Sequence, residues 1–467
     1  MSKLFASEMK IKLYTGLGLF VLIVIHLLIL KNITYTAWPE MFSYPYLINK
    51  GFLIYKDFAH PYVPLLSLIL SLYYKIVGIS LISNQLFTWT FILINDFLIF
   101  FISKKILKNF FVLGPVAVYV LLQPIFEGNM LWFDLATTPF ILGSFLSFLL
   151  IKSEKKKLFW FGFLLSLALL IKQQAIVLIG LILIILLLSK ETRKQVWYFI
   201  LGGIVPVCVI FSTLLIQGVF KDYLFWTLEF PLIWLPKFPG YTELPGIKNT
   251  ILLVTLFGLS SLFLIKNFFK IDLFGKITFV SIIATVFMAF PRFSYFHLQP
   301  AIAILIVFYT LMLKKSSNVG IFFLMIGVFY GLLLWKDYHP FIGVETARFY
   351  DKQDLSLAEF VKDNTRKEDA VYFLGPHSLI FVLADRIPPK PWIENFVWHF
   401  EIPGVQSAQI EGFKKEKSLV IFKQSPATGN WYDLDVYQPK EITGYINQNF
   451  EAVGKNQSGV EIWKRKN

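Results

Sequence analysis

The sequence predicts a polytopic α-helical membrane protein with a small soluble α/β domain at its C-terminus. Of the 467 residues, 56% are hydrophobic and 16% are charged, whereas a soluble globular chain is nearer half apolar and a quarter charged. Apolar runs such as 13–30 (LYTGLGLFVLIVIHLLIL) are about as long as the roughly 20 residues that span a bilayer core. From about residue 336 the chain becomes polar and mixed. Composition and run length therefore indicate the class without any motif.

About eleven apolar runs are predicted to span the membrane as helices: 13–30, 82–102, 110–126, 135–151, 158–171, 174–189, 196–216, 249–265, 276–290, 297–313 and 319–335. Cytoplasmic loops are enriched in lysine and arginine. If the N-terminus lies inside, every dense cationic cluster falls on the cytoplasmic side: Lys104, Lys105 and Lys108; Lys152, Lys155, Lys156 and Lys157; Lys190, Arg193 and Lys194; Lys266, Lys270 and Lys276; Lys314 and Lys315.

Segment 61–78 is apolar enough to span, but a span there would move all clusters from residue 104 onwards to the outside. We therefore expect this segment to be a helix lying in the outer interface. The prediction is a multi-pass protein of the cytoplasmic membrane, with a cytoplasmic N-terminus and an extracytoplasmic C-terminal domain. Its net charge of +14 is then explained by cytoplasmic loops and anionic lipid headgroups, so no nucleic-acid partner is expected.

Two domains are predicted: a membrane domain at 1–335, with its first outer loop at 31–81, and a soluble domain at 336–467. In the latter, patterns favour helices at 355–364 and 440–450 and strands at 369–375, 417–423 and 459–465. Helices that alternate with short strands are typical of a small α/β domain. The single cysteine, Cys208, excludes a disulfide framework and a cysteine-based metal motif.

Polar side chains gather in the segments predicted to lie at the outer membrane face, where ionisable groups are candidates for function. They come from the first loop, from the turns after the third and fifth spans, and from the turn after the ninth span: Glu40, Tyr55, Asp57 and His60; Glu127 and Asp134; Lys172 and Gln173; Arg292, Tyr295 and His297. Cations for a phosphate and a carboxylate for proton transfer are what an anionic, membrane-borne substrate requires.

Each of these residues also has a structural explanation. Glu40 and Asp57 could be solvated surface charges, and Asp134 could cap the N-terminus of the fourth span. Lys172 could extend its ammonium group to the lipid headgroups, and Arg292 and His297 could anchor a helix end in the same way. The buried pair Asn95-Asp96 receives no role.

Four stretches carry a resemblance to a known family. They are Trp38-Pro39-Glu40 followed by GFLIYKDFAHPYVPL (51–65), LLIKQQAIVL (169–178), PRFSYFHLQPAIAIL (291–305) and LAEFVKDNTRKEDAVYFLG (357–375). In these short motifs, and in its layout over nearly the whole length, the chain resembles the GT-C superfamily of membrane glycosyltransferases. The likeness is greatest to the glycosyltransferase family 39 group, which includes protein O-mannosyltransferases and the aminoarabinose lipid A transferase.

The resemblance implies a sugar donor linked to polyprenyl phosphate and an acceptor that is a protein, a lipid or a polysaccharide. It makes Glu40 the general base, with Asp57 as a second candidate catalytic acid. The other implied roles are donor-phosphate binding by Lys172, Arg292 and His297; substrate binding by Tyr55, His60, Gln173 and Tyr295; and binding of a divalent metal, Mg²⁺ or Mn²⁺, by Glu127 and Asp134. The family often has an Asp-Glu pair where this chain has Glu40-Met41.

Two alternatives of other classes stay open. A flippase or transporter for lipid-linked sugars would have charged residues deep in several spans and internal repeats. The sequence has no clear repeat, and its outer polar residues gather on one face. A catalytically inactive scaffold would use the C-terminal domain to bind cell-envelope partners, and the missing second acid after Glu40 favours that alternative.

Overall fold

The computed structural model describes residues 2–107, 109–338, 347–433 and 436–466, except for the side chains of 2–12, 109, 110, 337 and 338. Lys108 of one predicted cationic cluster and residues 339–346 of the predicted soluble domain lie outside the described residues. The chain divides into two compact units. Unit 1 comprises Met1–Tyr35, Gln85–Ile210 and Glu243–Glu345, and unit 2 comprises Thr36–Asn84, Phe211–Thr242 and Thr346–Asn467. Two segments assigned to the membrane domain from sequence, 36–84 and 211–242, thus group with the C-terminal residues.

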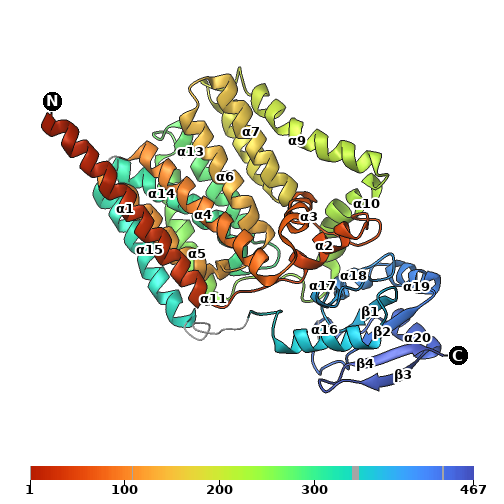
Figure 1. Ribbon diagram of the computed structural model, residues 1–467. Helices are drawn as coiled ribbons and strands as arrows, with labels where there is room; N and C mark the ends of the chain where they lie inside the picture. The colour runs from red at the N-terminus through yellow and green to blue at the C-terminus, as the bar shows by residue number, and fades with distance from the viewer. Residues whose placement is uncertain (1, 108, 339–346, 434–435, 467) are drawn as a thin grey trace. The chain divides into compact units, whose positions relative to one another are not determined.

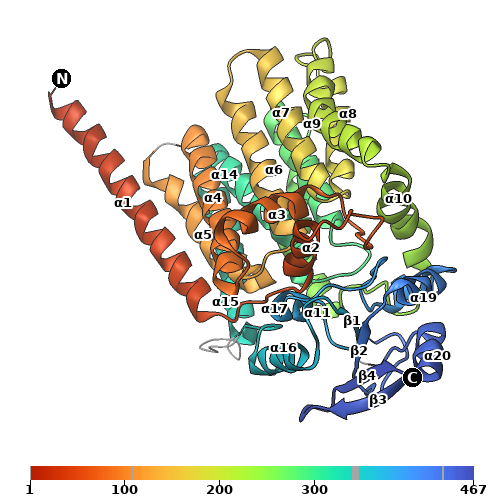
Figure 2. The same ribbon diagram turned by 45° about the vertical axis from the view of Figure 1, so that its right-hand side comes forward.

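Helices occur at every position predicted to span the membrane (Figures 1 and 2). They are α1 (Ser2–Asn32), α4 (Leu81–Ile106), α5 (Leu113–Gln123), α6 (Phe133–Leu150), α7 (Glu154–Ile171), α8 (Ala175–Leu188), α9 (Trp197–Ile216), α11 (Ile247–Leu253), α12 (Leu259–Asn267), α13 (Leu273–Phe287), α14 (Gln299–Lys315) and α15 (Ser317–Tyr338). Short 3₁₀ or π turns adjoin several of them: η1 (Asn109–Val112), η2 (Pro124–Gly128), η5 (Val254–Gly258) and η6 (Tyr295–Leu298). Among the described residues, seven helical segments are long and apolar enough to cross a membrane.

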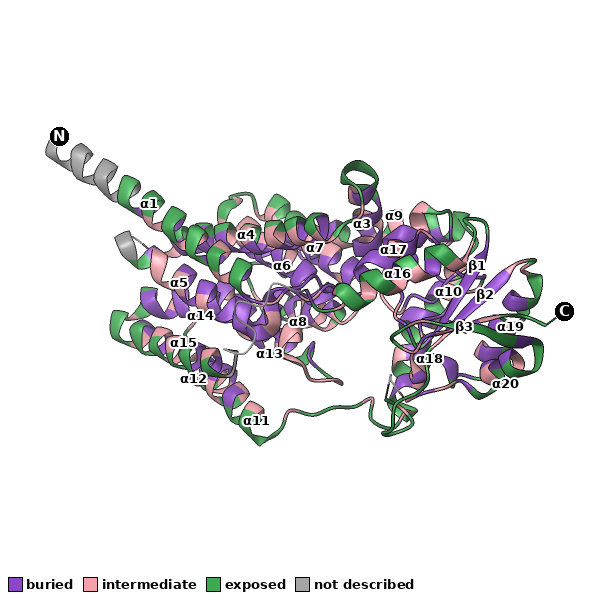
Figure 3. Cartoon of the chain, turned by 60° about the horizontal axis from the view of Figure 1, so that its bottom comes forward, coloured by how far each residue is buried: buried purple, intermediate pink, exposed green. Residues whose placement is uncertain are grey.

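Helix α14 is the centre of unit 1. It packs against α5, α6, α13 and α15, and Figure 3 colours it as buried over most of its length. Glycine allows close contact elsewhere in the bundle. A Cβ atom at Gly162 of α7 would lie 2.1 Å from the carbonyl oxygen of Phe199 in α9. Small residues permit such backbone approach between membrane helices, where van der Waals packing is a main source of stability.

Segments 36–84 and 211–242 of unit 2 form the helices α2 (Glu40–Asn49), α3 (Leu65–Val77) and α10 (Phe220–Leu224), and α10 is followed by the π and 3₁₀ turns η3 (Phe225–Trp234) and η4 (Leu235–Lys237). Helix α3 is the segment predicted to lie in the interface. It has 13 residues, and at 1.5 Å per residue its length of about 20 Å is well short of a bilayer core of about 30 Å. It packs on α2, and its Tyr74 hydroxyl donates to the carbonyl of Met41 at 3.3 Å.

The C-terminal residues of unit 2 form the predicted α/β domain. A four-stranded sheet has the order β1-β2-β4-β3, with β1 (Ala370–Leu374) parallel to β2 (Leu419–Lys423), and β4 (Glu461–Arg465) antiparallel to both β2 and β3 (Phe450–Lys455). The register of β1 and β2 runs from Ala370↔Leu419 to Leu374↔Lys423. Predicted helices 355–364 and 440–450 correspond to α16 (Lys352–Asn364) and α20 (Lys440–Asn449).

Strand β3 and three helices of this domain were not predicted from sequence. The helices are α17 (Leu379–Ala384), α18 (Val397–Phe400) and α19 (Val405–Lys415), and all lie in the crossover from β1 to β2. A parallel pair of strands requires a crossover connection of a dozen residues or more. Because α17 and α18 are short, they carry little helical periodicity that a sequence pattern could reveal.

Candidate active site

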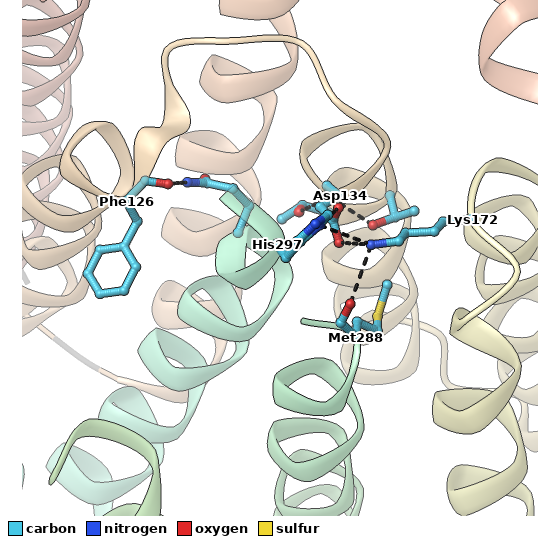
Figure 4. Close-up of polar contacts among 8 residues, drawn as sticks. Phe126, Asp134, Lys172, Met288 and His297 are labelled. Atoms are coloured by element: carbon cyan, nitrogen blue, oxygen red, sulfur yellow. Dashed lines mark hydrogen bonds and ion pairs between the residues drawn. The ribbon is translucent and has the colours of Figure 1, made fainter. Parts of the chain in front are cut away.

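Three ionisable side chains form a buried cluster in unit 1 (Figure 4). The Lys172 ammonium donates to Asp134 Oδ1 at 2.6 Å, and His297 Nδ1 lies 2.7 Å from Asp134 Oδ2. Lys172 Nζ is also 3.4 Å from His297 Nδ1 and 3.5 Å from the carbonyl oxygen of Met288. The side chains of Asp134 and Lys172 are 0% and 1% exposed. Three residues that the sequence analysis singled out in separate turns are thus in contact.

Local structure explains how these residues meet. Asp134 is the second residue of α6, Lys172 is the C-cap residue directly after α7, and His297 belongs to the 3₁₀ turn η6 directly before α14. Two structural explanations from the sequence fail here. The N-cap of α6 is Trp132 and not Asp134, and Lys172 turns into the bundle instead of extending to lipid headgroups.

The cluster does not fit the divalent metal site proposed for Asp134 and Glu127. Both oxygens of Asp134 are occupied by Lys172 and His297, and a metal ion there would lie beside an ammonium group, which repels it. Glu127 lies in the turn η2 with a left-handed backbone (φ 52°). Within the part of the chain that the structure describes, no three His, Cys, Asp or Glu side chains form a group suited to a metal.

Arg292, unlike Lys172, is an accessible cation of unit 1. Its side chain is 43% exposed, and its Nε lies 3.6 Å from Glu243 Oε2. Backbone hydrogen bonds hold the two segments together, since Glu243 N donates to Pro291 O and Phe293 N donates to Glu243 O. Arg292 also acts electrostatically on His297, so it lies near the buried cluster. Of the two predicted substrate-binding residues here, Tyr295 donates to Asn249 Oδ1 at 2.6 Å, and Gln173 follows Lys172 in the turn before α8.

Glu40 is buried in unit 2, so its interpretation as a solvated surface charge is wrong. It is the first residue of α2 and is 7% exposed. Its Oε2 atom has no hydrogen-bond partner among the described residues. Burial raises the pKa of Glu40, while its own backbone amide and His377 oppose the shift less strongly. A buried carboxyl group with a free oxygen and a raised pKa is suited to accept a proton.

The other three candidates from the first loop are engaged in the structure of unit 2. Asp57 accepts from the backbone N–H of Leu53 at 3.0 Å and from the Lys390 ammonium at 2.8 Å. His60 contacts Tyr62 O and Ser67 Oγ with its two ring nitrogens, at 2.7 and 2.8 Å, and burial lowers its pKa to about 4. The hydroxyl of Tyr55, which is 3% exposed, donates to Tyr62 O. These contacts support structural roles for all three residues.

Sequence reasoning missed a second buried acid, Glu394. It is 7% exposed and, like Glu40, has an Oε2 atom without a hydrogen-bond partner among the described residues. Burial raises its pKa, and the charge of Glu40 raises it further. The sequence signal was a lone acid in the aromatic stretch PWIENFVW (391–398). A single acid in such a stretch does not indicate a function unless its neighbours in the folded protein are known.

A polar network inside unit 1 explains the buried Asp96. His26 of α1 contacts Asp96 of α4 at 2.8 Å and Gln123 of α5 at 3.1 Å, and Gln123 donates to Gln299 of α14 at 3.2 Å. Gln299 in turn donates to the carbonyl of Phe126 in η2 at 2.8 Å. These bonds link four helices and satisfy the carbonyls of the π turn, as buried polar groups in a membrane require.

Comparison with known proteins supports the fold. No family model matches the sequence, and no curated protein matches it. Among solved structures, ArnT from Cupriavidus metallidurans bound to undecaprenyl phosphate is similar with a TM-score of 0.60 at 9% identity, over 96% of this chain and 97% of that one. The oligosaccharyltransferase of Archaeoglobus fulgidus, tethered with an acceptor peptide, gives a TM-score of 0.59 at 10% identity, over 98% and 74% of the two chains.

A further structure of the archaeal enzyme, AglB in complex with an inhibitory peptide and a dolichol-phosphate, gives a TM-score of 0.58 at 11% identity, over 97% and 74% of the chains. The predicted fold class, a polytopic helical membrane protein with a small C-terminal α/β domain, is confirmed by these likenesses and by the apolar helices. Another structure of the archaeal enzyme is a complex with Zn and sulfate.

Proposed function

We propose that this protein is a glycosyltransferase of the outer face of the cytoplasmic membrane, similar to the family 39 group, that transfers a sugar from a polyprenyl-phosphate donor to an acceptor. The observation that carries the proposal is Glu40, a buried carboxyl group with one unpartnered oxygen and a raised pKa. The proposal is also supported by the fold, since similar structures contain undecaprenyl phosphate and dolichol-phosphate. The acceptor is a hydroxyl group of a protein, a lipid or a polysaccharide.

In the proposed reaction the acceptor oxygen forms a bond to the anomeric carbon of the sugar. The bond between that carbon and the phosphate oxygen of the donor breaks, and its electron pair stays on the polyprenyl phosphate. Glu40 takes the proton of the acceptor hydroxyl, so that the nucleophile gains charge as the bond forms. A single displacement of this kind inverts the configuration of the sugar.

Arg292 is proposed to bind the donor phosphate, because it is exposed enough to reach a ligand and has a guanidinium group that matches phosphate geometry. Lys172 and His297 are proposed to assist. The Lys172 ammonium is already balanced by Asp134, so its direct contribution requires that the phosphate share or replace this carboxylate. Protonation of His297 would leave the cluster with a net positive charge suited to an anion.

Replacement of Arg292 by glutamine is expected to raise the KM for the lipid-linked donor by about 10- to 100-fold. A change of this size corresponds to the loss of one or two hydrogen bonds to a charged group. Replacement of its partner Glu243 by glutamine is the matched control. This change releases Arg292 and should lower that KM or leave it unchanged. Steady-state kinetics with purified protein in detergent and a synthetic polyprenyl-phosphate sugar measure both. An unchanged KM in Arg292→Gln would exclude Arg292 from phosphate binding.

The proposed orientation gives a separate prediction. In a Cys208→Ala background, a cysteine at Asn430 is expected to react with a membrane-impermeant maleimide added to intact cells. A cysteine at Ser153, between α6 and α7, is expected to react only after the membrane is permeabilised. Both positions are exposed, so protein burial does not explain a difference in labelling. The reverse pattern would place the C-terminal domain in the cytoplasm.

A lipid-sugar flippase is the second candidate function, and the buried His26–Asp96 pair within α1 and α4 is the observation that favours it. Charged residues deep in membrane helices mark substrate or proton pathways in many transporters. Proteoliposomes distinguish the candidates: a transferase releases free polyprenyl phosphate and a glycosylated acceptor, whereas a flippase moves intact donor between leaflets.

A further inference from the structure

Glu40 and Glu394 lie in one buried cluster of unit 2, although they are 354 positions apart in the sequence. Helix α17, which follows Ser378, packs against α2, which begins at Glu40. The hydroxyl of Ser378 lies 3.1 Å from the hydroxyl of Ser43 in α2 and within hydrogen-bonding reach of Glu394. The charges of both acids contribute to the raised pKa of Tyr44. The first loop and the C-terminal domain therefore each contribute one carboxyl group to this cluster.

We infer that Glu394 is the positioning partner of Glu40: the two carboxyl groups hold one proton between them, Glu40 as the ionised member and Glu394 as the neutral one. This inference rests on the proposed function, in which Glu40 is the base. Two buried carboxylates close together repel each other in a medium of low dielectric constant, so one of them stays protonated. Glu394 thereby supplies from a distant segment the second acid that is missing next to Glu40 in the sequence.

The surroundings of the pair favour one shared proton. Burial lowers the pKa values of His60 and His399 to about 4, so both rings are neutral at neutral pH. Burial raises the pKa values of Tyr44 and Tyr372, so both phenols stay protonated. Two further titratable groups act on this cluster: Tyr62 acts on Tyr44, and His377, which acts on Glu40, contacts Asp354 of α16 at 2.8 Å.

The order of ionisation assigns the two roles. His377 favours the charged form of Glu40, whereas the charge of Glu40 opposes that of Glu394. As the pH rises, Glu40 therefore loses its proton first and Glu394 keeps its proton to a higher pH. A bell-shaped dependence of kcat/KM on pH follows. The acid limb reports the ionisation of Glu40, and the alkaline limb reports the ionisation of Glu394, which adds a second negative charge next to the base.

The test is the pH profile of sugar transfer by full-length Glu394→Gln protein in detergent. Glutamine is uncharged and keeps a hydrogen-bond donor. The activity of the variant at neutral pH should therefore stay within about threefold of the wild-type activity, which is less than the loss of one hydrogen bond usually causes. Its alkaline limb should disappear while its acid limb stays. Glu394→Ala, which loses the donor, should be about 10- to 100-fold less active. A wild-type profile without an alkaline limb, an alkaline limb that persists in Glu394→Gln, or inactivity of the folded Glu394→Gln variant would each overturn the inference.

A milder variant keeps the inference testable if Glu394→Gln does not fold, and thermal unfolding gives a second measurement. Ser378→Ala removes a hydroxyl group that lowers the pKa of Glu394, so the alkaline limb should move to higher pH. An unchanged limb would count against the inference. In thermal unfolding, a carboxyl group whose pKa is raised in the folded state stabilises the fold at low pH and loses this contribution as the pH rises through the folded pKa. Glu394→Gln should therefore gain thermal stability relative to wild type at alkaline pH, and a parallel decline of both proteins would contradict this.

Comparison of the Glu40→Gln and Glu394→Gln variants distinguishes failure of this inference from failure of the proposed function. If Glu40→Gln protein transfers sugar normally, Glu40 is not the base and the proposed function fails in that respect. If Glu40→Gln is inactive and Glu394→Gln keeps the wild-type alkaline limb, the function stands and only the pairing is wrong.

Discussion

Replacement of Glu40 by glutamine is expected to reduce sugar transfer by about 100- to 10,000-fold, the usual contribution of a general base. Glutamine has nearly the shape of glutamate but takes no proton at the Oε2 position, which in Glu40 is free of hydrogen bonds from the described residues. Because burial disfavours the charged carboxylate, the variant should fold at least as well as the wild type. Transfer from a synthetic polyprenyl-phosphate sugar, with release of the polyprenyl phosphate as the readout, measures the loss.

Asp57→Asn is the matched control, since Asp57 belongs to the same segment, 31–81, but its carboxylate is engaged by Lys390 and by the backbone of Leu53. This variant should lose some stability and keep most of its specific activity. Equal losses of activity in the two variants would mean that the loop tolerates no change of charge, and Glu40 would have no special role. Full activity of Glu40→Gln would exclude it as the base.

The pH dependence of the wild type follows from the same residue. Glu40 must be ionised to accept a proton, and its pKa is raised by burial. The acid limb of activity should therefore lie above the value of about 4.3 that is usual for a glutamate in water, and activity should fall as the pH decreases through this limb.

The membrane fold could be predicted largely from local features. Apolar runs gave the helix positions because a bilayer imposes a minimum length on any spanning helix. Charge asymmetry assigned segment 61–78 to the interface, and the structure gives it a helix of only 13 residues, Leu65–Val77. In the C-terminal domain, the buried strands β1 and β2 read as short apolar runs between turns, whereas β3 (FEAVGK) is exposed apart from its first residue and has no such run.

The site could be predicted only as a set of residues and not as a set of contacts. Lys172 was a candidate because it interrupts two apolar runs, but its ion pair with Asp134 joins positions 38 residues apart and leaves no local pattern. Glu394 was not predicted for the same reason, since its proposed role depends on Glu40, which lies in a different part of the sequence. Asp57 and His60, in contrast, were candidates because of their residue types, and hydrogen bonds within unit 2 account for their positions in the fold.

The ion pair between Lys172 and Asp134 gives the largest expected effect on stability. Lys172→Met should destabilise the protein by about 3–5 kcal/mol, because it leaves the carboxylate of Asp134 buried without its main counter-charge. Both side chains are almost fully buried, so water cannot compensate. Unfolding by SDS in mixed micelles measures the change. Lys414→Met is the control: its partner Glu411 and Lys414 itself are 60% and 52% exposed, and such surface pairs contribute little to stability.

The double variant Asp134→Leu/Lys172→Met separates a structural role from a functional one. Removal of both charges leaves apolar side chains of similar size, so most of the lost stability should return. If the pair serves only the fold, activity should return with stability. We expect instead that the refolded double variant binds donor poorly, with a KM raised by at least about tenfold, because the phosphate then lacks the ammonium group that Asp134 holds in place. Recovery of both properties would show that Asp134 and Lys172 are a structural ion pair, and Arg292 would remain as the proposed phosphate ligand.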